Sequence, residues 1–203
     1  MQRIICELLK EAIIDTGLAW LDSVNGMVEP LQIKVGGKTS VITKTIPVYR
    51  NPSQTGCKKG NDYTQCVPRT ALKSLVYLEP DNPSNNAHTG RYDEFDMTVK
   101  IILWLNLKQL NIAEETAANY ADELMGNLPH SLANLSPYNT IRVDIDNCER
   151  NLSDVNKYTY DEAESQMWIY PFDFSVISMK IRFRRTNTCH ATTVSNPSVC
   201  KIY

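Results

Sequence analysis

The chain has 203 residues, which is enough for one domain that buries its own core without disulfide staples. Its 21 basic and 23 acidic residues leave a formal net charge of -2, so no overall field demands nucleic acid or an acidic surface as a partner. Six scattered cysteines and a start without signal-like character lead us to expect synthesis in a reducing cytosol. No apolar run approaches the roughly 20 residues that cross a bilayer, so we expect a soluble protein.

The first predicted element is an amphipathic helix over residues 3–15, in which apolar side chains recur along one stripe. A hairpin follows. Residues 31–35 alternate apolar and polar side chains up to a Gly-Gly pair, and residues 41–49 return as the second strand. Pro47 has no backbone N–H, which places this second strand at an edge of the sheet or at its own end.

Residues 50–69 are polar and punctuated by glycine and proline, which predicts a long loop. Long loops in compact domains are usually functional or disordered, so we expect this one to contact another protein or to line a channel. Its thiols, Cys57 and Cys66, could close a disulfide or bind a metal with distant ligands, and two unpaired thiols are the favoured alternative. The basic residues of the loop are Arg50, Lys58, Lys59 and Arg69.

Alternation is clearest over residues 96–106, which predict the central strand. On its second face, Ile102 and Trp104 indicate that something packs across the middle of that side of the sheet too. A shorter apolar strand at 72–78 is predicted to lie beside it, and a polar loop over 79–94 connects the two. The wholly apolar first face consists of Met97, Val99, Ile101, Leu103 and Leu105.

An amphipathic helix is predicted directly after the central strand. Asn111 is placed as its N-cap with Glu114 three residues later, in the manner of a capping box, and Gly126 supplies a stop. The apolar residues at helical spacing are Ala117, Tyr120, Ala121, Leu124 and Leu128.

The last third of the chain predicts two more strands. Residues 141–145 alternate apolar and charged side chains, and residues 144–164 predict a solvated acidic surface. Residues 167–185 predict the last long strand, in which the apolar positions change parity, so we expect Pro171 to break or bulge it. Residues beyond it have no periodicity and are predicted to form an arm.

These elements together predict an α+β fold, with a mostly antiparallel β-sheet, two main helices packed on it, long loops and a C-terminal arm. We expect residues 1–185 to form a single domain with an extended loop at 50–70, and residues 186–203 to form the arm.

No residue pattern predicts an active site or a cofactor site. His88, His130 and His190 share no helical or strand spacing, and no nucleophile elbow surrounds any cysteine. Cys189 and Cys200 with His190 would supply only part of a metal site, and the acidic stretch lacks the pattern of a calcium loop. We therefore expect no catalytic residue, no metal and no cofactor.

Charge is segregated along the last strand. Lys180, Arg182 and Arg184 share one face, where they could meet phosphates or the acidic stretch of a neighbouring copy. Identical subunits in a ring bring two different patches together, and the near-neutral total charge favours this second alternative. The predicted interface residues are Lys180, Arg182, Arg184, Arg185, Asp144, Asp146, Asp161, Glu162 and Glu164.

The order of elements, with the phrases KIILWLNLKQLN and YPFDFSVISMKIRFRR, resembles the small α+β ring proteins of tailed-phage necks and tails. These include tail terminators, tail-completion proteins and ring proteins of crAss-like phages. The resemblance implies a structural virion protein, made in the host cytoplasm, that forms a ring of about six or twelve copies in the head-tail connector or tail. Its implied partners are portal, neck or tail proteins, with DNA in the lumen and no membrane. No signature residue transfers, because such proteins act through shape and interfaces.

Two other functions stay open on the residues alone. One is a protein-binding module of a non-viral assembly or secretion apparatus, since antiparallel sheets with helices serve many functions. The other is a thiol- or metal-dependent enzyme.

Overall fold

The computed structural model describes residues 1–36, 41–49, 66–89, 91–113, 117–133, 137–150, 152–158 and 170–186. The helices are α1 (Gln2–Asp15), α3 (Leu107–Leu110), α4 (Ala117–Asn127) and α5 (Leu152–Asn156). The strands are β1 (Ser23–Gly36), β2 (Val41–Tyr49), β3 (Ser74–Pro80), β4 (Ser84–Thr89), β5 (Tyr92–Asn106), β6 (Ser131–Leu132), β7 (Tyr138–Glu149) and β8 (Phe172–Thr186). None of the described helices is long and apolar enough to cross a membrane.

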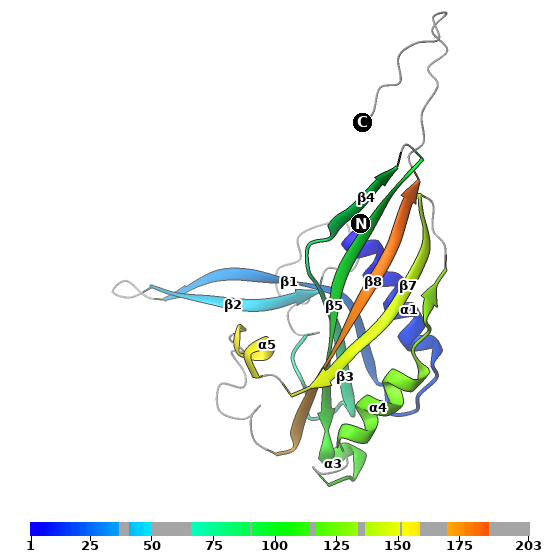
Figure 1. Ribbon diagram of the computed structural model, residues 1–203. Coiled ribbons are helices and arrows are strands. Elements are labelled where there is room, and N and C mark those ends of the chain that lie inside the picture. The colour runs from blue at the N-terminus through cyan, green and yellow to red at the C-terminus, as the bar shows by residue number, and fades with distance from the viewer. Residues whose placement is uncertain are drawn as a thin grey trace, which may run out of the picture.

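The described strands form one sheet in the order β2-β1-β3-β5-β8-β7-β6, and β4 pairs with the first part of β5 (Figure 1). Only β1 and β3 pair in parallel; the other pairs are antiparallel. The predicted α+β fold, a mostly antiparallel sheet with α1 and α4 as the main helices, is confirmed. Pro47 lies in β2 at the end of the strand order, as predicted. The predicted arm over 186–203 lies outside the described residues except for Thr186, which ends β8.

The first core lies between the sheet and the two main helices. Strand β5 contributes the predicted apolar face from Met97 to Leu105, all at most 2% exposed. Helix α1 buries Ile5, Leu9 and Ile13, whose spacing of four residues places them on one stripe of the helix. Helix α4 adds Ala121 and Leu124, and Leu128 follows it. Helical and strand periodicities therefore meet on one buried surface, as the sequence patterns require.

A second core covers the opposite face of the sheet at its lower end. Ile102 and Trp104, 0% and 1% exposed, lie in it, and the ring of Trp104 packs 5.4 Å from that of Phe174. Its other buried members are Val28, Tyr49, Cys66, Val67, Leu75, Tyr77, Val155, Tyr158 and Val176. The prediction that something packs on this side is confirmed, and residues of the same chain do so.

The two cores correct the interpretation of the last strand. Strand β8 pairs with β5 in one unbroken register from Phe172 opposite Asn106 to Thr186 opposite Tyr92, so the bulge against β5 is absent and the predicted strand begins only after Pro171. The apolar positions change parity because the strand passes from one core to the other: Phe174 and Val176 lie in the second core, and the run that begins at Ile177 lies in the first. Pro171 simply precedes the strand.

Two local predictions are also wrong. Asn111 does not cap α4; it ends α3 in the left-handed conformation with φ 55°, and Asn106 is the N-cap whose side-chain oxygen accepts from the Gln109 backbone N–H at 3.2 Å. The segment 79–94 is not a plain loop, because β4 within it pairs with β5 from Asp96 to Tyr92. Short polar strands of this kind carry no apolar alternation to reveal them.

Candidate interaction surfaces

In the upper half of the sheet, charged side chains line the face away from α1 and α4, and no other described helix or strand packs on it (Figure 1). Register places Arg182 opposite Asp96 and Arg184 opposite Glu94 on neighbouring strands. Lys180 Nζ lies 2.8 Å from the Asp96 carboxylate, and Arg184 Nε lies 3.1 Å from that of Glu94. The predicted basic run is therefore paired with acids of its own chain on β5, which the sequence interpretation did not foresee.

Among the acids paired on this face, Asp96 has the least exposed side chain, at 14%. Its burial alone would raise its pKa, but hydrogen bonds from Lys180 and Asn86, with the charges of Lys180 and Arg182, lower that pKa below its ordinary value. The ionised carboxylate is thus stabilised where it lies, and it organises the cations around it.

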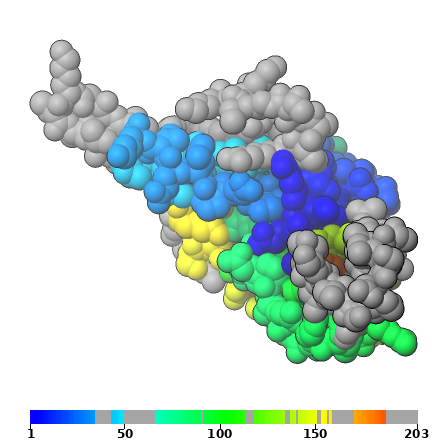
Figure 2. All heavy atoms as spheres, turned by 90° about the horizontal axis from the view of Figure 1, so that it is seen from above, coloured from blue at the N-terminus to red at the C-terminus, as the bar shows by residue number. Residues whose placement is uncertain are grey.

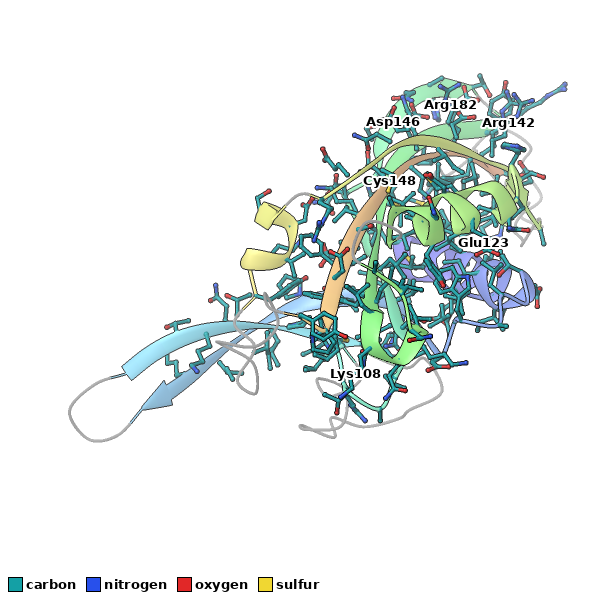
Figure 3. The ribbon with its side chains drawn as sticks, turned by 90° about the horizontal axis from the view of Figure 1, so that it is seen from below. Lys108, Glu123, Arg142, Asp146, Cys148 and Arg182 are labelled. Atoms are coloured by element: carbon teal, nitrogen blue, oxygen red, sulfur yellow. The ribbon has the colours of Figure 1, made fainter. Side chains whose placement is uncertain are left out.

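Arg182 is held more loosely than Lys180. It lies 3.8 Å from Asp96 and 3.8 Å from Asp144, and its side chain is 53% exposed. Arg142 of β7 lies directly opposite Arg182 and belongs to no ion pair among the described residues. Figure 3 shows Arg142, Asp146 and Arg182 on the side of β7 and β8 that faces away from α1 and α4. Asp144 therefore meets the basic run within one chain, and pairing between copies stays a prediction.

The other predicted interface residues lie on either face of the sheet or outside the described residues. Arg185 points to the opposite face, where it contacts Asp93 at 2.6 Å and lies over the ring of Phe95. Asp146 is exposed next to an irregularity in the β7 register. Asp161, Glu162 and Glu164 lie outside the described residues.

The predicted contact loop is described only at its end. Arg69 is exposed there, whereas Arg50, Lys58 and Lys59 lie outside the described residues. Cys66 is fully buried in the second core, and Cys57 is outside the described part. The favoured expectation that these two thiols stay unpaired therefore remains a prediction.

Three ion pairs attach the segment around α5 to the sheet, and the sequence interpretation of a solvated acidic surface is wrong for Asp154. That carboxylate is 7% exposed and accepts from Lys100 Nζ at 2.6 Å. Lys157 pairs with Glu79, and Arg150 with Asp173. Burial raises the pKa of Glu79 against the opposing effect of Lys157, whereas the hydrogen bond to Asp154 raises that of Lys100. These ion pairs lie between the sheet and a segment that covers the second core.

The β1–β2 hairpin projects from the body as a two-stranded arm (Figure 2). Its base is anchored by Val28 and Tyr49 in the second core, and the Tyr49 hydroxyl accepts from Lys10 Nζ of α1 at 3.0 Å. Further out, Leu31 and Ile33 are only half-buried and belong to neither core. Lys44, opposite Ile33, lies on the same face of the ribbon. A two-stranded ribbon that projects from the body is a surface suited to contact with another molecule.

Reactive groups are sparse in the described part of the chain. It contains no cluster of three or more possible metal ligands. His88 contacts Asp93, which also holds Arg185, so this acid ties β4 and β8 to β5. Cys6 is buried in the first core, and burial raises its pKa to about 12, which keeps the thiol protonated.

Comparisons with protein-family models, curated proteins and solved structures find no match to this chain.

Proposed function

We propose that this chain is a structural subunit of a homo-oligomeric ring, of the kind that joins neighbouring rings in the head-tail connector or tail of a tailed phage and surrounds the DNA channel. The single observation that carries the proposal is the projecting β1–β2 arm, which is anchored at its base in the second core and on α1 and extends beyond the body (Figure 1). The arm adds no covering to either core beyond its base, so its outer part serves contact with other molecules.

The rest of the fold supports the same role. The body is stabilised internally, since one chain covers both faces of the lower sheet and pairs most charges of its open upper face. A rigid body with a projecting arm is suited to a subunit that keeps its shape while it assembles. The exposed Arg142 and Arg182 leave positive charge on the open face, which could lie toward DNA or toward an acidic neighbour.

Electron microscopy of the purified protein tests the proposal. We expect closed rings with a lumen wide enough for duplex DNA, which is roughly 20 Å across by the groove dimensions of B-form DNA. Particles without a lumen, or a monomer at every concentration, would contradict it. The genes beside the one that encodes this chain give a second test, since portal, capsid or tail genes are expected there and a secretion or assembly gene cluster would favour the non-viral binding module.

A further inference from the structure

Among the described residues, no third strand lies at either edge of the outer part of the β1–β2 arm. Strand β1 pairs with β3 only from Ser23 to Met27, and β2 ends the strand order of the sheet. Beyond Met27, the two strands pair with each other from Val28 opposite Tyr49 to Gly36 opposite Val41, and neither has another strand partner among the described residues. A ribbon of two strands is only marginally stable in water, and a third strand on either side would stabilise it.

The register shows which backbone groups point outward from these edges. Pro30 lies directly opposite Pro47, and two prolines cannot exchange N–H···O=C bonds. Opposed residues in an antiparallel ladder alternate between pairs that exchange two hydrogen bonds and pairs that exchange none. Gln32 opposite Thr45 and Lys34 opposite Thr43 are therefore also pairs of the second kind. Their N–H and C=O groups point away from the partner strand.

Each edge of the arm thus lacks outward backbone donors near the body and presents them farther out. At the base, Pro30 on one edge and Pro47 on the other present no donor, which blocks strand addition there. Toward the tip, Gln32 and Lys34 offer donors and acceptors on the β1 edge, and Thr43 and Thr45 offer them on the β2 edge. Because the two prolines lie at the same point along the arm, one on each edge, pairing with a further strand is confined to the outer part of the arm.

We propose that the arms of neighbouring copies pair edge to edge, with the outer part of β2 of one copy hydrogen-bonded to the outer part of β1 of the next. This inference rests on the proposed ring. In a ring, the arms of all copies point in equivalent directions, so β1 of each copy runs outward beside a β2 that runs inward. That contact is antiparallel, uses both open edges of every arm, and closes into a barrel of hairpins with no free edge.

Two features of the arm fit this partner. The outward-pointing residues on both edges are uncharged except for Lys34, so the contact opposes no like charges. Two-fold pairing of β2 with β2 would leave every β1 edge open and would end at two copies. One face of the arm is polar, with Gln32, Lys34, Thr43 and Thr45, and the other carries Leu31, Ile33 and Ile46 together with Lys44, so a barrel of arms presents one continuous polar surface.

Proline substitutions at outward positions test this pairing. Thr43→Pro removes an outward donor from the β2 edge, and Gln32→Pro removes one from the β1 edge, in each case without loss of a hydrogen bond within the hairpin. Thr43→Val, which keeps the donor, is the matched control. We expect wild type and Thr43→Val to form the same ring by size-exclusion chromatography with light scattering, and either proline variant alone to lose the ring peak with its melting temperature kept.

Mixing the two proline variants gives the sharpest result. Each retains one intact edge, so a one-to-one mixture is expected to give a two-copy complex, and nothing larger, through the β1 edge of Thr43→Pro and the β2 edge of Gln32→Pro. Rings in either proline variant, or full rings in the mixture, would overturn the edge pairing while the proposed ring stands. A wild type that stays monomeric would overturn both.

Cysteine cross-linking covers the case in which a proline variant fails to fold. Oxidation of mixed Thr43→Cys and Gln32→Cys chains should give a cross-linked pair that neither variant gives alone. Equal cross-linking in the single-variant samples, or none in the mixture, would refute the pairing.

Discussion

Replacement of Trp104 by alanine tests whether the second core belongs to the single chain. Trp104 is 1% exposed and packs 5.4 Å from the ring of Phe174, both provided by neighbouring strands of one sheet. A buried aromatic side chain removes roughly 150–250 Å² from water. At about 25 cal/mol per Å², losing the lower figure costs about 4 kcal/mol, which lies within the usual range for tryptophan truncation in a core.

Urea denaturation followed by fluorescence measures this loss. We expect a decrease of about 4 kcal/mol in the free energy of unfolding, the same at low and high protein concentration, because the covering residues belong to the same chain. Ile14→Ala is the matched control, since Ile14 is 51% exposed on α1 and its loss should change stability by no more than about 0.5 kcal/mol. A loss below about 1 kcal/mol for Trp104→Ala, or one seen only at concentrations where copies associate, would show that another molecule forms this core.

Three further predictions concern charge and backbone. Glu79→Gln should leave the free energy of unfolding at pH 7 equal to or above that of wild type, because burial raises the pKa of Glu79. The difference should vanish as the pH falls through that raised pKa, since Glu79 of the wild type then gains a proton, and a clear loss of stability at pH 7 in urea titrations would contradict this. Asp96→Asn should have the opposite effect and lower the free energy of unfolding at pH 7 by about 1–2 kcal/mol. The lowered pKa of Asp96 stabilises the fold above the ordinary pKa of 3.8, and this stabilisation is lost as the pH falls through the pKa of the folded state. An unchanged urea midpoint at pH 7 would refute this prediction. Gly26→Ala should lower the melting temperature, since the added Cβ would lie 2.2 Å from Glu7 Oε1 and 3.2 Å from Tyr49 Cε2. Gly126→Ala, whose Cβ would meet nothing within 4 Å, should stabilise α4 by about 0.5–1 kcal/mol. A Gly26→Ala variant more stable than Gly126→Ala would contradict this packing.

Alternating and helical patterns predicted the elements whose apolar residues face one core. The central strand, α1 and the hairpin followed from periodicity because burial on one side imposes it. The same reasoning failed for β8, where the apolar residues change parity because Phe174 and Val176 lie in the second core and Ile177 in the first. It also misplaced Asn111, because both Asn106 and Asn111 are suited to a helix end and only the backbone conformation decides between an N-cap and a left-handed C-terminal residue.

The charged residues show a different limit of sequence reasoning. The run from Lys180 to Arg185 is visible in the sequence, but its partners Glu94 and Asp96 lie far away along the chain and meet it only through the β5–β8 register. Acids that precede an apolar strand are also common solvent-exposed residues, so no local signal marks them as partners. Asp154 of α5 was misjudged for the same reason, since its partner Lys100 lies far away along the chain on β5.

The edges of the β1–β2 arm could be described only once the strand register was known. Pro47 alone predicted an edge, but only its position opposite Pro30 shows that the two prolines close both edges at the base and leave the outer backbone groups open. The proposed contact surface consists of backbone groups, so a search for catalytic motifs cannot find it.

Native mass spectrometry of the wild-type protein across a concentration series tests the central claim most directly. Contacts between two different edges that close on themselves predict one discrete mass above the monomer, an integral multiple of 23.1 kDa that stays fixed as concentration rises. A monomer at every concentration, or an open series of masses that lengthens with concentration, would contradict a closed ring.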